Sequence, residues 1–210
     1  MSDNSLRDEV LKWKERYDNT YRDLEQAQKK LENDRKKASE SDTETAEMEK
    51  ELHKYNVLLG LTDVTGKGVV VTVTDSSVDS SKLIDANSAV VHDGDLVEIV
   101  NILKNAGAEA IEINEQRIIN STAITCDGAV VRINGEKIGV PFVIKAIGSP
   151  EGLKGALEMP NSYVDQMIQD GVDVTIKKQN SISIKKYDGT FENEYMKDRW
   201  FNWREKARLQ

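Results

Sequence analysis

The chain is poor in the residues that build metal sites, disulfides and nucleophilic centres. Its 210 residues include one cysteine and two histidines. A single cysteine cannot form an internal disulfide, and it excludes a cysteine-rich metal site. Two histidines leave little for zinc or nucleophilic chemistry, and no paired-carboxylate or triad pattern stands out. We therefore expect no metal, no cofactor and no enzymatic activity.

Long apolar runs and an excess of basic charge are also missing. No window of about 18 apolar residues occurs, so no segment is predicted to span a bilayer. The first residues are polar, which argues against a signal peptide. The formal charge is −8 and the sequence pI about 5.0. Because an acidic chain repels phosphate backbones, nucleic acid is not an expected partner.

What is present first is a long helical segment. Residues 4–59 contain no glycine and no proline and are dense in charged residues. Apolar or small residues recur there at alternating spacings of three and four, the heptad pattern of a coiled coil. This pattern is polar between Asp34 and Thr45. The predicted dimerisation seam consists of Leu6, Val10, Trp13, Tyr17, Leu24, Leu31, Met48, Leu52, Tyr55 and Leu59.

We expect residues 1–60 to form a coiled-coil stalk that makes a homodimer. A helix so polar on its other faces needs a partner for its apolar seam. Two alternatives stay open. The helix could dock on its own domain, or the segment could be frayed, which its polar middle favours. Gly60 is predicted to end the helix as a C-cap glycine.

The pattern after Gly60 changes to the alternation typical of strands. "LTDVTGKG" is predicted to be a linker, and "VVVTVTD", residues 69–75, a strand. Residues 76–88 are predicted to be a long loop and residues 90–92 a short strand. The next helix is predicted to be capped by Asp93 or Asp95. Its apolar face consists of Leu96, Ile99, Val100 and Leu103.

Hairpin and cap signals organise the rest of the domain. Asn134-Gly135 and Asp188-Gly189 predict hairpins, which require antiparallel neighbours. Ser149-Pro150 predicts a helix start. "VDVTIKK" and "SISIKKYDG" are predicted to be two strands. Residues 61–190 therefore indicate an α+β domain, a ferredoxin-like and mostly antiparallel α/β sandwich. A doubly wound parallel sheet is the less favoured alternative.

The last residues, 191–210, are predicted to form a strand and helix extension. Two of the three tryptophans, Trp200 and Trp203, lie there beside several basic residues. A helix on a partner or a membrane surface is one interpretation. The others are a terminal helix packed on its own domain or on its dimer mate, and an expression tail.

The candidate binding residues lie at strand ends and in an apolar run. Asn114, Gln116 and Arg117 are predicted at a turn between two strands, where a guanidinium can bind a carboxylate or phosphate, or tie down a loop. Lys145 lies within "PFVIKAIG" and marks a site if it faces inward, or is plain surface if the strand is half exposed. His92 beside Asp93 suggests a general base or a helix-start histidine. Cys126 is interpreted as a buried, inert thiol.

Residues 58–189 resemble a known bacterial family in their sequence motifs and in the order of these motifs. The stretches that carry the resemblance include "LLGLTDVTGKGVVVTVTDS", "VHDGDLVEIVNILKNAGAEAIEINEQRIINSTAITCDG" and "VRINGEKIGVPFVIKAIGSPEGLKGALEMPNS". They are similar to the YlxW/YlxX-like family, domain of unknown function 881, whose members include so-called division-initiation proteins. No catalytic activity is established for that family.

The resemblance implies a membrane-anchored scaffold outside the cytoplasm, at the bacterial cell envelope, with a link to cell division or sporulation. This sequence lacks the family's N-terminal membrane helix, so we expect the full-length protein to carry one and these 210 residues to be soluble. The expected partner is an envelope or division protein. The alternative function is a sensor for a small anionic ligand or cell-wall fragment, bound near Asn114, Arg117 and Lys145. A hydrolase that uses His92 with Asp93 is a third hypothesis.

Overall fold

A computed structural model describes residues 3–39, 43–76, 90–190 and 194–195. The chain divides into two compact units, Met1–Leu59 and Gly60–Gln210. Apart from residues 194–195, the predicted extension at 191–210 lies outside the described residues, and so does the predicted loop at 76–88 apart from its first residue. The architecture is α+β, with a helical N-terminal segment and antiparallel sheets, as the sequence predicts at this level.

The first unit consists of two helices, α1 (Asp3–Ser39) and α2 (Thr43–Leu58). The heptad pattern predicts one helix, whereas two are described, and residues 40–42 between them lie outside the described residues. Residues 40–42 belong to the polar part of the pattern, between Asp34 and Thr45. Gly60 follows with a φ of 78°, the left-handed conformation predicted for its C-cap role. No described helix is long and apolar enough to cross a membrane.

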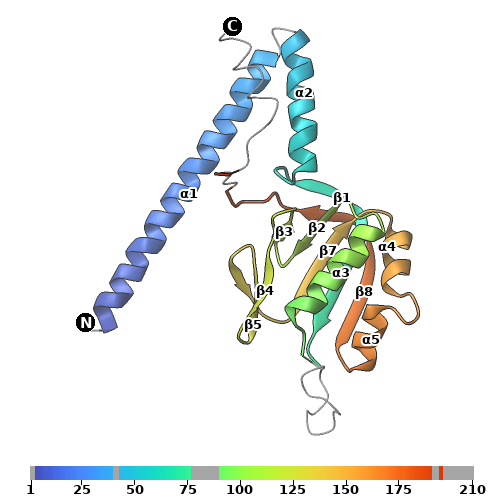
Figure 1. The fold of residues 1–210 in the computed structure, drawn as a ribbon. Coiled ribbons are helices and arrows are strands. Elements are labelled where there is room, and N and C mark those ends of the chain that lie inside the picture. Colours follow the sequence, from blue (N-terminus) through green and yellow to red (C-terminus); the bar gives the residue numbers. More distant parts are fainter. Residues whose placement is uncertain (1–2, 40–42, 77–89, 191–193, 196–210) are drawn as a thin grey trace. The chain divides into compact units, whose positions relative to one another are not determined.

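A five-stranded antiparallel sheet forms the centre of the second unit, in the order β3-β2-β7-β1-β8 (Figure 1). Three helices lie between its strands along the chain, and a separate antiparallel sheet, β4-β5-β6, follows β3. The strands are β1 (Val64–Thr74), β2 (Ala110–Ile113), β3 (Gln116–Ile118), β4 (Ile124–Asp127), β5 (Val130–Ile133), β6 (Glu136–Ile138), β7 (Phe142–Ile147) and β8 (Asp173–Ile184). The helices are α3 (Asp93–Asn105), α4 (Pro150–Leu157) and α5 (Tyr163–Gln169).

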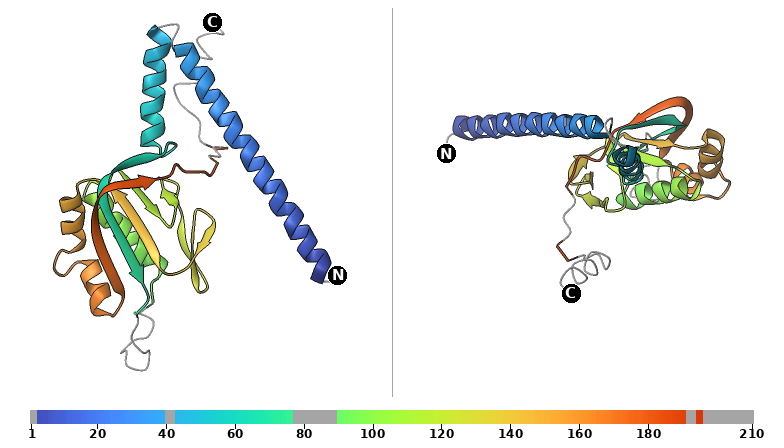
Figure 2. Two further views of the ribbon diagram at one scale, coloured as in Figure 1. Left: turned by 180° about the vertical axis from the view of Figure 1, so that it is seen from behind. Right: turned by 90° about the horizontal axis from the view of Figure 1, so that it is seen from above.

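The main core lies between this sheet and its helices, which cover one face (Figures 1 and 2). Alternate residues of a strand point to opposite faces, so Val69, Val71 and Val73 of β1 all face the helices. The predicted apolar face of α3 is confirmed, because its four residues are buried: Leu96, Ile99, Val100 and Leu103. The opposite face of the sheet carries the polar residues of interest.

Several predicted turns and caps are confirmed. Asn134 and Gly135 connect β5 to β6 with φ values of 52° and 90°, as a type I′ turn requires. The Ser149 hydroxyl accepts a hydrogen bond from the Gly152 N–H at the start of α4. Proline at the first turn of α4 is also as predicted.

Other boundaries differ from the prediction. The predicted linker is partly strand, because β1 already begins at Val64. A Cβ at Gly68 would overlap the carbonyl oxygen of Ala146, so glycine here serves close packing of β1 on β7. The two strands predicted at the C-terminal end are one, β8, which ends at Ile184. Residues 185–190 are not in a strand, and most of the residues that would follow the turn predicted at Asp188-Gly189 lie outside the described ones. Residues 90–92 form no strand.

Candidate functional site

A row of charged side chains crosses the sheet face that lies opposite the helices. Glu112 of β2 is in register with Arg117 of β3 on one side and Lys145 of β7 on the other. Their neighbours Ile111, Ile113, Ile144 and Ala146 point into the helix-covered core. Alternation therefore places all three charges on the opposite face. Glu112 is 1% exposed and Arg117 4% exposed, so both ionised groups are withdrawn from water.

The charges in this row are satisfied from within the chain. Lys145 Nζ donates to Glu112 Oε1 over 2.6 Å, and the second carboxylate oxygen accepts from the Lys185 N–H. Arg117 Nη1 donates to the carbonyl oxygens of Thr62 and Lys185. Burial lowers the pKa of Arg117, while the nearby negative charges of Glu112 and Asp63 act in the opposite direction. Lys145 pairs with the buried Glu112 carboxylate, and its own side chain is partly exposed.

Asn114 lies at the predicted turn between β2 and β3, whereas Gln116 and Arg117, predicted at the same turn, belong to β3. Asn114 adopts a positive φ of 45°. Its amide bridges to the start of β7: Nδ2 donates to the carbonyl of Pro141, just before the strand, and Oδ1 accepts from the Val143 N–H within it. Gln116 Oε1 accepts from Asn134 Nδ2. These hydrogen bonds fix the loops. They involve the same side-chain amides that are predicted from the sequence to bind a ligand.

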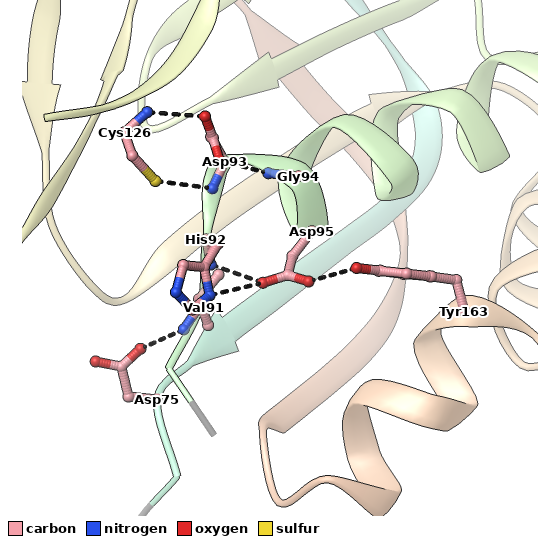
Figure 3. A network of polar contacts seen from close by, with 8 residues as sticks. All are labelled: Asp75, Val91, His92, Asp93, Gly94, Asp95, Cys126 and Tyr163. Carbon is pink, nitrogen blue, oxygen red and sulfur yellow. Dashed lines mark hydrogen bonds and ion pairs between the residues drawn. The ribbon is translucent and has the colours of Figure 1, made fainter. Parts of the chain in front are cut away.

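His92 lies apart from that row, at the N-terminus of α3 (Figure 3). Its backbone N–H donates to Asp95 Oδ2 over 2.6 Å, and its Nδ1 lies 3.8 Å from the same oxygen. Asp93 does not pair with it. The Asp93 carboxylate instead accepts from the backbone N–H groups of Cys126 and Gly94. The His92–Asp93 pair of the hydrolase hypothesis is therefore not formed.

Cys126 is exposed, and not buried as predicted. Its Sγ accepts a hydrogen bond from the Asp93 N–H over 3.4 Å. That bond favours the thiolate, but burial and the negative charges of Asp93 and Asp95 outweigh it, so the pKa of the Cys126 thiol is raised. A thiol with a raised pKa is protonated at neutral pH and is a weak nucleophile.

The remaining polar contacts around α3 are also structural (Figure 3). Tyr163 Oη donates to Asp95 Oδ1 over 2.7 Å, and this hydrogen bond, with burial and the carboxylate charge, raises the pKa of Tyr163 to about 12. The Asp75 carboxylate accepts from the Val91 N–H. Three carboxylates thus each accept a backbone N–H near the start of α3. Among the described residues, no three His, Cys, Asp or Glu side chains are grouped to hold a metal ion.

Glu112 is the residue that the sequence analysis missed. It alternates with isoleucines in "EAIEIN", which predicts only that it faces away from them. Its partners come from β3, β7 and the stretch after β8. The strand register that brings these together is set by the whole sheet, so no local pattern could reveal it.

These observations define an α+β domain on an antiparallel sheet, preceded by a helical segment, with its buried charges satisfied internally. Residues 51–197 match a family described as "Bacterial protein of unknown function (DUF881)", and the chain belongs to this family. The resemblance found in the sequence is thereby confirmed.

Two relatives come from Bacillus subtilis (strain 168). UPF0749 protein YlxW is 33% identical over 132 residues, which cover 63% of this chain and 57% of that protein. UPF0749 protein YlxX is 26% identical over 163 residues, which cover 74% and 68%. A crystal structure of an uncharacterized conserved protein from Mycobacterium tuberculosis has a TM-score of 0.58 and 22% identity, over 70% of this chain and 99% of that one. It shows the fold alone.

Proposed function

We propose that this chain is a non-catalytic interaction module, in which α1 and α2 pair with a second copy and the α+β domain contacts a partner protein. The exposed seam of α1 is the observation that carries the proposal. Its apolar side chains at heptad spacing each expose more than half of their surface: Val10, Trp13, Tyr17, Leu24 and Leu31. A helix with this pattern gains most of its stability from packing its apolar face.

A second copy is the occupant that the heptad spacing favours. Residues at alternating spacings of three and four interlock with the same residues of another copy. The seam continues on α2, where Met48 and Tyr55 also expose more than half of their surface. The charged residues on the other faces of α1 keep those faces in water, so the seam is the surface available for pairing.

Two leucines of α1 provide a matched test in the full chain. Leu24 belongs to the seam and is 52% exposed, whereas Leu11 lies outside the seam and is 61% exposed. Sedimentation equilibrium would compare wild type with Leu24→Glu and Leu11→Glu. Each buried leucine contributes about 1.5–3 kcal/mol, and a dimer loses two. The dissociation constant should therefore rise about a hundred-fold or more for Leu24→Glu and change little for Leu11→Glu.

Two outcomes would contradict this proposal. A wild-type chain that stays monomeric at every concentration has no pairing for the seam to mediate. Equal weakening by both substitutions would show that general helix polarity, and not the seam, controls association.

The family resemblance supports a wider proposal for the full-length protein: a membrane anchor ahead of α1, a location outside the cytoplasm at the bacterial envelope, and a link to cell division or sporulation. The exposed Cys126 offers a test. A membrane-impermeant maleimide should label this thiol in intact cells, with Cys126→Ala as the unlabelled control. Labelling that appears only after lysis would contradict the location.

We also propose that the domain is a ferredoxin-like sandwich. Two strand–helix–strand units, β1–α3–β2 and β7–α4–α5–β8, interleave in the order β2-β7-β1-β8, with the helices on one face. All neighbouring strands are antiparallel, which is the arrangement of a split βαβ fold. Nuclear Overhauser contacts between β1 and β7 would test this register, and parallel pairing would contradict it.

A further inference from the structure

We infer that Glu112 and Arg117 form a junction clamp, which ties the segment entering the domain to the segment leaving it. The first segment is residues 60–63, which directly follow the helical unit, and the second is residues 185–187, which follow β8. This inference goes beyond the proposed function and is independent of self-association, because every contact lies within the unit Gly60–Gln210.

The two segments contact each other directly. The Tyr187 N–H donates to the Gly60 carbonyl over 2.8 Å. The Lys186 N–H donates to Asp63 Oδ1, also over 2.8 Å. These hydrogen bonds lie beyond the last pair of the β1–β8 ladder, Val64 with Ile184. They extend the pairing of the two chain ends past the sheet.

The buried side chains of Arg117 and Glu112 form hydrogen bonds with both segments. One nitrogen, Arg117 Nη1, donates to Thr62 O over 3.3 Å and to Lys185 O over 3.2 Å, one acceptor from each segment. Glu112 Oε2 accepts from the Lys185 N–H, while Lys145 occupies Oε1. Glu112 is paired with Lys145, and the buried Arg117 lies near the negative charges of Glu112 and Asp63. Loss of Glu112 therefore removes one of the two charges that favour the buried guanidinium.

Gly60 connects the helical unit to the clamp. Its φ is 78°, and a Cβ there would lie 2.8 Å from Ile119 Cγ2 and 3.4 Å from Arg117 Nε. Only glycine suits this backbone conformation and this space. The first residue of the domain is thus packed against the arginine that also binds the departing segment.

The clamp makes the two segments one cooperative element. If residues 60–63 move away, Lys186 and Tyr187 lose their acceptors and Arg117 loses one carbonyl. If Glu112 is neutralised, the hydrogen bonds from Lys145 and from the Lys185 N–H lose their charged acceptor, and the negative charge beside Arg117 disappears. Glu112 and Arg117 are therefore positioning residues, which set the path of the chain on both sides of the domain.

Hydrogen exchange measured by NMR on the full chain tests the inference. Glu112→Gln should speed exchange of the Lys185, Lys186 and Tyr187 amides together by about ten-fold or more, as expected when hydrogen bonds to a charged group are lost. Amides of β1 and β7 should change little. Glu151→Gln is the matched control, since it removes the partner of Lys178 on the helix-covered side of the sheet.

An increase confined to Lys185, or no increase, would overturn the inference, because Lys186 and Tyr187 would then be held without the clamp. If Glu112→Gln instead speeds exchange of every amide equally, the domain unfolds as a whole. A second variant, Gly60→Ala, then tests whether the two segments are coupled. That substitution strains the segment entering the domain, and its Cβ lies nearest to Ile119 and Arg117 and not to Glu112. Faster exchange at Lys185, whose acceptor is untouched, supports the clamp, and unchanged exchange at Lys185 overturns it.

Discussion

Helices α1 and α3 show how the same kind of apolar pattern can have two different outcomes. Both carry apolar residues at helical spacing. In α3 four of these are buried against the sheet, whereas in α1 every side chain from Val10 to Lys37 is exposed. Periodicity therefore reports that a helix has an apolar face, but not what covers it. The stability of α3 comes from its own domain, while the described seam residues of α1 remain exposed and contact neighbours such as Arg16 and Tyr21 in the same helix.

The largest effect expected from this difference comes from a leucine-to-alanine change made in each helix. Leu103→Ala in α3 removes a side chain that is 0% exposed. It should lower the free energy of unfolding of the domain by about 2–5 kcal/mol. Leu24→Ala in α1 should leave that free energy unchanged. Denaturation followed by NMR signals of β1 and β7 separates the two, because these strands belong to the domain alone. Equal losses would show that α1 stabilises the domain.

A smaller effect concerns the sheet that covers α3. Gly68→Ala places a methyl group against the carbonyl group of Ala146, and these backbone atoms of β7 leave no room for it. Overpacking of this kind typically costs about 1–3 kcal/mol. Gly155→Ala in α4 is the control, since nothing lies within 4 Å of its Cβ position, and alanine is the better helix former there. Urea midpoints should fall for the first variant and hold or rise for the second. A harmless Gly68→Ala would contradict the close packing of β1 on β7.

Local patterns predicted much of the fold for clear physical reasons. The buried face of α3, the Asn134-Gly135 turn and the Ser149 cap each depend on residues a few positions apart. Strand pairing does not. The stretch "RIINSTAITC" contributes β3 to one sheet and β4 to another. The polar residues in the middle of β8 suggest a turn in the sequence. In the structure β8 stays paired with β1 on both sides of them, with a register shift between Gly66 and Gly68 of β1.

The candidate site was predictable only in part, for the same reason. Lys145 is recognisable as a charge within an apolar strand, whereas Arg117 is predicted at a turn and lies within β3. Their shared contact with Glu112 is not, because it depends on the alignment of β2, β3 and β7. Whether these residues bind a ligand stays a prediction. Their hydrogen bonds to Thr62, Lys185 and Glu112 show what they do within the chain.

A still smaller effect comes from the side chains that cover the first turn of α3. Tyr163 of α5 donates to Asp95, and Tyr163→Phe removes only that hydrogen bond. The loss should be about 0.5–1.5 kcal/mol, toward the lower end because Tyr163 is 37% exposed. Tyrosine titration should also change, since the signal with the raised pKa of about 12 should disappear in this variant. If that signal persists, another tyrosine carries the raised pKa.

The smallest expected effect is a pH dependence at the same turn, where β4 contacts α3. The hydrogen bond from the Cys126 N–H is the main cause that lowers the pKa of Asp93 below its usual value of 3.8. Because the folded-state pKa is below the unfolded-state one, the stabilisation is fully present above pH 3.8 and is lost as pH falls through the folded-state pKa. Asp93→Asn lacks this titration. Wild type should therefore have a higher urea midpoint than Asp93→Asn at pH 6, and the difference should shrink toward pH 2.5. Other carboxylates with lowered pKa values, such as Asp127, are present in both proteins and cancel. A difference that stays constant with pH would show that the Asp93 charge does not hold β4 to α3.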